Sequence, residues 1–296
     1  MKIYIHESRE DVWVDAYFPK GARIDPGTAD GSILPTDGAM RLADGAIRPG
    51  GGAILPDDRA MLHDEGPILP ANESMQRPDA GALLPAALIC PGGGYRVLGT
   101  TEGRPVSDKF TDAGFAAFIL HYSVGEEAAS GFEGWEGFSP VRDLIAAMRL
   151  LKDGAAGYGI DRDRIALAGF SAGGHLCAGA CYSGALVKEG LLPKALILTY
   201  PMGGGADSGG AGRPQPDFDI ARMPYADDPA VKNLPTFMWH AKDDATVPFG
   251  ASERLDRRLK DEGMPHAFLV YEHGIHARPF LDPGWFDKAL VWFSGL

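Results

Sequence analysis

Apolar residues follow two different patterns along the chain, one before and one after about residue 85. Near the N-terminus, apolar and polar residues alternate over 2–7 and 11–18, which predicts an antiparallel pair of strands. Later in the chain, apolar residues form short and nearly continuous runs at 86–90, 115–122, 164–169, 195–200, 236–240 and 266–271. Such runs are typical of strands buried on both faces of a parallel sheet.

Segments with a helical pattern separate or follow several of these runs, at 139–153, 250–263 and 285–296. In the first of them, apolar residues recur at helical spacing at Val141, Leu144, Ile145 and Met148. Strands that alternate with helices predict an α/β fold, with a mainly parallel sheet flanked by helices.

Composition narrows the class of protein. The 296 residues are enough for one large domain, and we expect a single domain over 1–296. With 28 basic and 40 acidic residues the net charge is −12, which argues against nucleic acid or an anionic membrane as partner. The chain shows no signal-peptide run and no stretch near the ~20 apolar residues of a membrane span. Its three cysteines form no disulfide framework, so we expect a cytoplasmic protein.

The segment GFSAGG, which begins at Gly169, places a serine where a buried strand gives way to an Ala/Gly-rich helix. Glycine and serine are common in tight turns, so a plain turn is one interpretation. The other is a nucleophile elbow, because residues 169–173 fit the pattern G-x-S-x-G around Ser171. A serine hydroxyl becomes a good nucleophile only beside a base, an acid that orients the base, and donors for the oxyanion.

Candidates for these groups follow in the chain order Ser, Asp, His of an α/β hydrolase. Asp243 and Asp244 both come just after a predicted strand, and His273 and His276 follow the last predicted strand. Upstream, the strand at 86–90 ends in the glycine run PGGGY, where backbone N–H groups can approach a substrate oxygen. Neither phosphate-loop pattern, G-x-x-x-x-G-K-[ST] nor G-x-G-x-x-G, is present in the glycine run.

Taken together, ALICPGGGY, RIALAGFSAGGHL, PTFMWHAKDDATVP and YEHGIHA resemble the α/β-hydrolase superfamily, specifically its acetyl-esterase or xylan-esterase-like branch, over about residues 85–296. The resemblance implies Ser171 as nucleophile, Asp244 as acid and His276 as base, with Asp243 and His273 as their neighbours. It also implies an oxyanion hole formed by the N–H groups of Gly93, Gly94 and Ala172. The chain departs from the family after His276, where HARPF replaces the usual glycine and short apolar stretch.

Other residues near these motifs have two interpretations each. Tyr95 and Arg96 are candidates for lining the acyl or alcohol pocket. Trp135 lies in the aromatic loop FEGWEGF and is a candidate for one wall of a sugar-sized or aryl-sized pocket, with loop packing as the alternative. We expect His175 to pack inside the protein and His240 to bond the acid loop. No metal-ligand spacing is present, and no cofactor is implied.

Residues 31–79 repeat in sevens, with Ile or Met at 33, 40, 47, 54, 61, 68 and 75. Proline and glycine recur inside the units, which excludes a coiled coil. Gly and Pro supply 18 of the 66 residues from 20 to 85, a composition near that of non-globular segments. We interpret 31–79 as a tolerated surface insertion; the alternative is a cover over the active site.

The sequence therefore predicts a serine carboxylic-ester hydrolase acting through an acyl-enzyme, and the resemblance implies acetyl or other small acyl groups on a sugar or other alcohol. A small-molecule ester is the expected partner, and the oligomeric state stays open. A prolyl-oligopeptidase-like peptidase uses the same machinery, although this chain lacks the large N-terminal propeller of many such enzymes. The third alternative is a binding protein on a hydrolase scaffold, which the intact Ser, Asp and His set disfavours.

Overall fold

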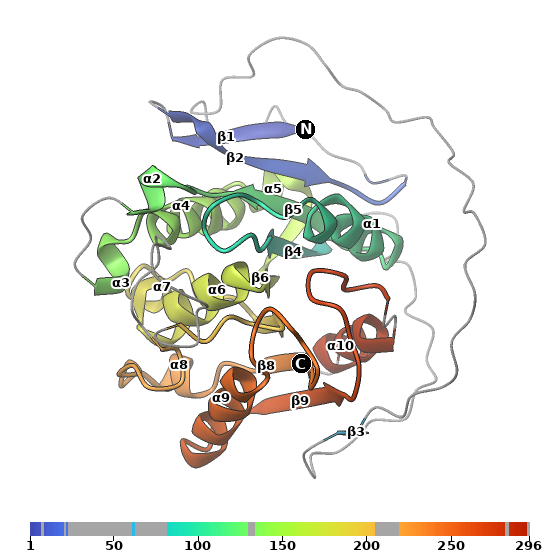
Figure 1. Cartoon of the computed structure of the whole chain (residues 1–296). Helices are drawn as coiled ribbons and strands as arrows, with labels where there is room; N and C mark the ends of the chain where they lie inside the picture. The colour runs from blue at the N-terminus through green and yellow to red at the C-terminus, as the bar shows by residue number, and fades with distance from the viewer. Residues whose placement is uncertain are drawn as a thin grey trace.

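The computed structural model describes residues 1–6, 9–20, 22, 61–62, 82–129, 134–204, 219–281 and 284–294. Within these residues nine strands form one sheet, in the order β1-β2-β5-β4-β6-β7-β8-β9-β3 (Figure 1). The six strands from β5 to β9 run parallel, while β1, β2 and β3 join antiparallel at the two edges. The mainly parallel α/β sheet and the N-terminal antiparallel pair are therefore confirmed.

The strands are β1 (Lys2–His6), β2 (Arg9–Tyr17), β3 (Met61–Leu62), β4 (Leu84–Cys90), β5 (Ala116–His121), β6 (Ile160–Phe170), β7 (Ala195–Thr199), β8 (Thr236–Ala241) and β9 (His266–Tyr271). The heptad segment 31–79 lies outside the described residues, apart from Met61 and Leu62. These two residues form β3, which pairs antiparallel with Leu269 and Val270 of β9.

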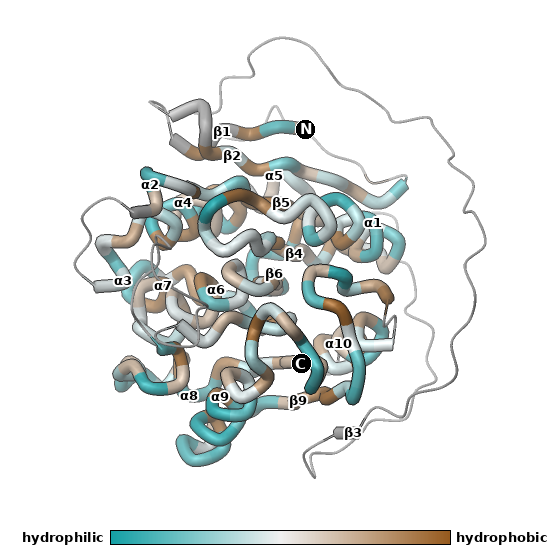
Figure 2. Tube along the Cα trace, in the orientation of Figure 1, coloured by the Kyte–Doolittle hydropathy of each residue, from teal (hydrophilic) through white to brown (hydrophobic). Residues whose placement is uncertain are grey.

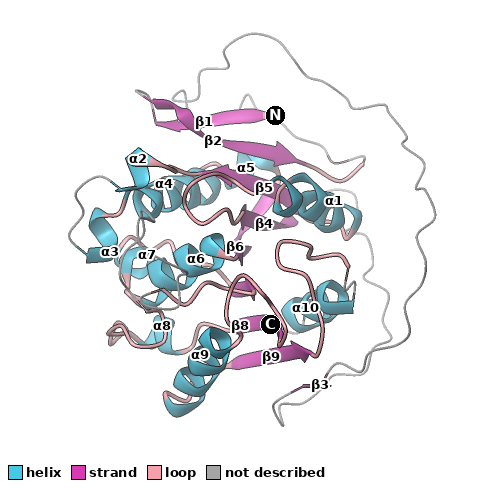
Figure 3. Ribbon diagram, in the orientation of Figure 1, coloured by secondary structure: helices cyan, strands magenta, loops and turns pink. Residues whose placement is uncertain are grey.

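The helical elements are η2 (Thr100–Glu102), α1 (Arg104–Asp112), α2 (Glu126–Ala129), α3 (Gly134–Gly137), α4 (Ser139–Asp153), α5 (Ala155–Tyr158), α6 (Ala172–Tyr182), α7 (Ala185–Lys188), α8 (Pro229–Lys232), α9 (Gly250–Asp261) and α10 (Gly284–Ser294). Figure 3 shows them on both faces of the sheet. The predicted helices at 139–153, 250–263 and 285–296 correspond to α4, α9 and α10.

Alternation along the strands divides the core into two layers, because successive side chains point to opposite faces of a sheet. On one face, Leu88 and Leu167 pack with apolar residues of α4, α6 and α9. On the other face, Ala87 and Ile89 pack with apolar residues of α1 and α10. The central strands are covered on both faces, which is why their apolar runs are almost uninterrupted. Figure 2 shows the hydropathy of each described residue along the trace.

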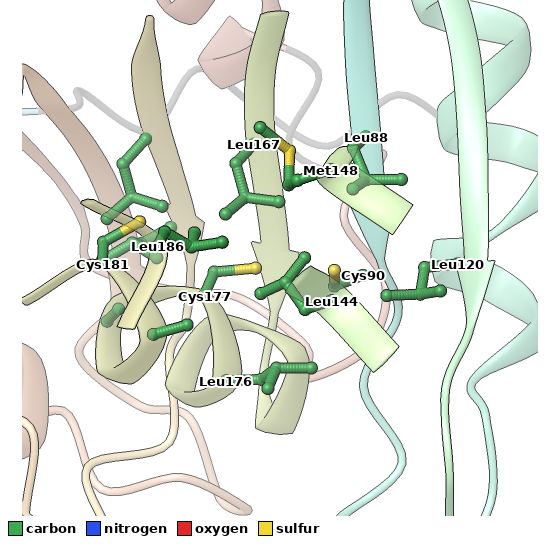
Figure 4. Close-up of a cluster of buried hydrophobic side chains, with 14 of the residues drawn as sticks. Leu88, Cys90, Leu120, Leu144, Met148, Leu167, Leu176, Cys177, Cys181 and Leu186 are labelled. Carbon is green, nitrogen blue, oxygen red and sulfur yellow. The ribbon is translucent and has the colours of Figure 1, made fainter. Parts of the chain in front are cut away.

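Helix α6 is buried on all sides, which an amphipathic surface helix is not. Figure 4 shows Leu176, Cys177 and Cys181 of this helix against Leu88, Cys90 and Leu167 of the sheet. The three cysteines are free and buried, as the sequence predicted for Cys177 and Cys181. Burial raises the pKa of the Cys177 thiol well above its usual value, so the thiol stays protonated and packs as an apolar group.

Strand order determines where a site can form. From β4 the chain goes to β5 on one side, and then returns to β6 on the other side of β4. In open α/β sheets ligands bind at such a switch point, outside the carboxyl ends of the strands. The loop after β4 begins at Pro91 and the turn after β6 is Ser171, so the glycine run and the serine meet at the switch point.

Candidate active site

Ser171 occupies a strained turn between β6 and α6, with φ 51° and ψ −116°. The two glycines of the pattern are required by close approach of backbone. A Cβ atom on Gly173 would lie 2.0 Å from the carbonyl oxygen of Cys90, and one on Gly169 would lie 2.5 Å from that of Gly173. A side chain at position 169 or 173 would collide with this backbone, so the turn that carries Ser171 requires glycine at both positions.

The serine belongs to a chain of hydrogen bonds with His276 and Asp244. Nε2 of His276 lies 2.9 Å from Oγ of Ser171, and Nδ1 lies 2.7 Å from Oδ2 of Asp244. The side chain of Asp244 is 2% exposed and that of His276 is 11% exposed. The structure thus brings together the three residues that the resemblance implied, from the loops after β6, β8 and β9.

Several donors surround the Asp244 carboxylate. His240 lies 3.2 Å from Oδ2, and the N–H groups of Thr246 and Val247 donate to Oδ1 at 2.8 and 2.9 Å. Burial acts to raise the pKa of Asp244, but the hydrogen bonds from the two histidines and from Val247 outweigh it, and the pKa lies well below its usual value. The carboxylate therefore stays ionised and fixes an N–H on Nδ1 of His276, which leaves Nε2 free to accept a proton.

Asp243 and His273, which lie near Asp244 and His276 in the sequence, form a separate pair on the surface. Nδ1 of His273 lies 2.9 Å from Oδ2 of Asp243, and the N–H of Gly274 donates to Oδ1 at 2.8 Å. The His273 bond and the Gly274 N–H lower the pKa of Asp243 against a smaller effect of burial. This pair links the loops that carry Asp244 and His276 and has no contact with Ser171 among the described hydrogen bonds.

The glycine run forms a tight loop beside Ser171. Gly93 has φ +120°, and a Cβ atom there would lie 2.0 Å from the carbonyl oxygen of Val97. Within the described residues, the N–H groups of Gly93, Gly94 and Ala172 donate to no protein acceptor. Ala172 is the first residue of α6, where N–H groups have no partner inside the helix. Within the described part of the chain, the three N–H groups that the resemblance implied as oxyanion donors therefore have no protein acceptor.

The structure also describes the surroundings of Tyr95, Arg96 and Trp135, the remaining residues singled out in the sequence. Tyr95 is buried, and its hydroxyl lies 2.9 Å from Nδ1 of the buried His175. Arg96 is exposed at the tip of the glycine loop. Trp135 is 7% exposed and packs on the ring of His175 at a centroid distance of 5.0 Å. Its position against Gly179 of α6 is that of a packing residue, while its edge also lines an open surface pocket with Glu136 and Ser183.

Sequence reasoning missed two buried residues of this site, Glu102 and Tyr200. Glu102 is 1% exposed and accepts hydrogen bonds from the N–H of Gly92 at 2.7 Å and from the hydroxyl of Tyr200 at 2.8 Å. The ring of Tyr200 lies 4.7 Å from that of His276. A glutamate before a helix is usually an exposed residue, so no pattern indicated its burial. Tyr200 ends an apolar run, which indicated only a strand.

No group of three or more His, Cys, Asp or Glu residues in the described part of the chain is arranged to hold a metal ion. Among the described helices, none combines the length and the apolar character needed to cross a bilayer.

Comparison with known proteins finds esterases among the chain's relatives. The family model BD-FAE matches residues 76–190. The chain is 26% identical to endo-1,4-beta-xylanase B of Butyrivibrio fibrisolvens over 204 residues, which is 64% of this chain and 32% of the relative. It is 31% identical to an acetylxylan esterase of Xylanibacter ruminicola over 115 residues, 38% of this chain and 21% of that relative. The match thus spans about a third of the first relative's length and a fifth of the second's.

A solved structure with a similar fold is the acetyl ester-xyloside bifunctional hydrolase from Caldicellulosiruptor lactoaceticus. It superposes with a TM-score of 0.57 at 24% identity, over 94% of this chain and 97% of that chain. The sheet order, the turn at Ser171 and these relatives agree with the resemblance found in the sequence. The chain therefore has the α/β-hydrolase fold and is similar, over part of its length, to esterase-like α/β hydrolases.

Proposed function

We propose that this protein is a serine carboxylic-ester hydrolase that removes small acyl groups, acetyl first, from a sugar or other alcohol. The observation that carries the proposal is the hydrogen-bonded series from Ser171 through His276 to Asp244, at 2.9 and 2.7 Å. A nucleophile, a base and a group that orients the base are the three parts that acyl transfer requires.

In the proposed reaction, Oγ of Ser171 attacks the ester carbonyl carbon while Nε2 of His276 takes the hydroxyl proton. The carbonyl oxygen becomes an oxyanion, to which the N–H groups of Gly93, Gly94 and Ala172 donate. His276 then returns the proton to the alkoxy oxygen as the C–O bond breaks, and the alcohol leaves. Water, deprotonated by His276, attacks the acyl-enzyme, which releases the carboxylic acid and restores Ser171.

The substrate class rests on the names of the relatives. One is an acetylxylan esterase and another an acetyl ester-xyloside hydrolase, which supports an acetylated sugar as substrate. Because the chain covers only part of the two longer relatives, the acyl group and the alcohol are proposals about this chain.

The test is hydrolysis of acetylated xylo-oligosaccharides, measured as the acetate released. The Ser171→Ala variant, verified as folded by circular dichroism, is the control. Acetate release by the parent and none by the variant would support the proposal. Release of acetate by both would remove Ser171 from the reaction, and cleavage of peptides instead of esters would favour the peptidase alternative.

A further inference from the structure

The turn η2, which comes between the glycine loop and α1, joins three parts of the site. Glu102 accepts from the N–H of Gly92, at the start of the glycine loop, and from the hydroxyl of Tyr200, at the end of β7. The preceding residue, Thr101, donates from Oγ1 to the carbonyl oxygen of Ala277 at 2.8 Å. The side chains of Thr101 and Glu102 therefore hydrogen-bond to three parts of the site. These are the glycine loop, Tyr200 beside His276, and Ala277 after His276.

The Glu102 carboxylate lies close to the backbone at Gly92 and Gly99. A Cβ atom on Gly92 would lie 2.7 Å from Oε2 of Glu102, and one on Gly99 would lie 2.6 Å from the same oxygen. The N–H of Gly99 donates to the carbonyl oxygen of Gly92 at 2.8 Å and closes the loop around the carboxylate. The two glycines leave room for a carboxyl oxygen where any other residue would place a side chain.

The Glu102 carboxylate also interacts electrostatically with His276. Within the described part of the chain, the titratable side chains that interact electrostatically with Glu102 include Tyr200, Tyr122 and His276. Burial raises the pKa of Glu102, while the hydrogen bonds from Tyr200 and Gly92 and the charge of His276 act in the opposite direction. Burial also raises the pKa of both tyrosines well above the usual value, so Tyr200 donates to Glu102 as a neutral phenol.

The backbone is strained at two residues beside the base, Ala277 and Tyr200, and strain of this kind needs support. Ala277 has φ 58° and Tyr200 has φ 38°, both in the left-handed region that favours glycine. Conformations of this kind persist only where neighbouring groups hold them. The bond from Thr101 holds Ala277, and the bond to Glu102 together with that from the N–H of Tyr200 to the carbonyl oxygen of Trp239, at 2.8 Å, holds Tyr200.

We propose that Glu102 is a positioning residue for ester hydrolysis. Through Gly92 it fixes the position of the glycine loop, and through Tyr200 it supports the His276 imidazole as that ring becomes positively charged. This inference rests on the proposed function. Among the described residues Glu102 bonds to Gly92 and Tyr200 and not to Ser171, so its effect is on the geometry and the electrostatic environment of the reacting groups. Thr101 contributes to the same support by its hydrogen bond to Ala277, the residue after His276.

The test compares Glu102→Gln, Tyr200→Phe and Thr101→Val with the parent. Two rates are measured against pH: hydrolysis of p-nitrophenyl acetate, and covalent labelling of Ser171 by a fluorophosphonate. Glu189→Gln, which removes a negative charge from an exposed ion pair with Arg149, is the matched control for net charge. Thermal unfolding and circular dichroism establish which variants are folded.

Glu102→Gln is expected to lower kcat and the labelling rate by about 10- to 100-fold, with KM changed by less than about 3-fold. The acid limb of its kcat/KM profile moves to lower pH, because the neutral side chain no longer favours protonation of the base. Tyr200→Phe keeps the ring and shows a smaller loss, while Thr101→Val slows both rates without moving the acid limb. Glu189→Gln matches the parent.

A folded Glu102→Gln variant with parental rates, or with reduced rates and an unmoved acid limb, would overturn the inference. If that variant fails to fold, parental rates in both Tyr200→Phe and Thr101→Val overturn it instead. The proposed function is tested separately by the parent. A parent that neither hydrolyses esters nor reacts with the fluorophosphonate rejects the proposed function, whereas a reactive parent matched by Glu102→Gln rejects only the role of Glu102.

Discussion

Nε2 of the fully buried His240 lies 3.2 Å from Oδ2 of Asp244. The same carboxylate oxygen lies 2.7 Å from Nδ1 of His276. Because the Asp244 carboxylate can only accept, Nε2 of His240 carries the hydrogen and donates to it, and Nδ1 accepts from the hydroxyl of Ser252 at 2.8 Å. One acid thus accepts from two histidines, of which only His276 reaches Ser171.

His240→Leu is expected to lower kcat/KM for p-nitrophenyl acetate by about 10-fold, because Asp244 loses a donor that fixes its orientation. His240→Gln keeps an N–H donor and is expected to lose less. Steady-state kinetics of the two variants checks this order. Equal activity of His240→Leu and the parent would show that the bond from His240 has no part in orienting the acid.

The two adjacent aspartates are expected to respond very differently to the same change. Asp244→Asn presents the wrong group to Nδ1 of His276, and kcat falls on the order of 10⁴-fold. Asp243→Asn disturbs an exposed pair with His273, in which the aspartate side chain is 48% exposed, and we expect less than about a 5-fold loss. The measurement is kcat for both variants under one set of conditions. A large loss in Asp243→Asn alone would reverse the assignment of the acid.

Asp244 also predicts a pH dependence of stability. Its pKa in the folded protein lies below the usual 3.8, so its stabilising effect is present above about pH 4 and is lost as the pH falls further. The difference in Tm between the parent and Asp244→Asn is therefore expected to be constant from pH 8 to about 5, and to shrink below about pH 4. Calorimetry at several pH values measures it. A difference that grows with acidity would contradict the assigned direction of the shift.

The packing of Trp135 can be tested at Gly179. A Cβ atom at this position would lie 2.1 Å from the indole of Trp135. Gly179→Ala is therefore expected to destabilise the protein by about 1–3 kcal/mol, although alanine favours a helix. Denaturant unfolding measures this loss, and Trp135→Phe in the same chain should restore part of it by freeing space. If Gly179→Ala alone is as stable as the parent, Trp135 does not pack there.

The sequence predicted the parts of the fold that depend on local pattern. The central strands were visible because both of their faces are buried, and α4 because Val141, Leu144 and Met148 lie on one buried face. The sequence pattern placed the start of β6 at residue 164, whereas the strand begins at Ile160. The early part of the strand was missed because residues 162–164 are polar and exposed. Helix α1 was not predicted, since its nine residues carry only Val106 and Phe110 as buried apolar side chains.

The site was predictable to the extent that its residues stand in short motifs. Ser171, Asp244 and His276 each lie in a recognisable segment after a strand, and the resemblance selected among neighbouring candidates. Glu102 was not predictable, because its partner Tyr200 is 98 residues away in sequence and the contact exists only once β7 lies beside β6. The hydrogen bond of Tyr95 was also not predictable, because its partner His175 is 80 residues away in sequence.

The most direct test of the account is the rate of hydrolysis of p-nitrophenyl esters from acetate to long-chain acyl groups, with Ser171→Ala as control. The account predicts fast turnover of the acetate ester, rates that fall as the acyl chain lengthens, and a loss on the order of 10⁴-fold or more in the variant. Turnover that persists in a folded Ser171→Ala protein, or no turnover of any ester by the parent, would contradict it.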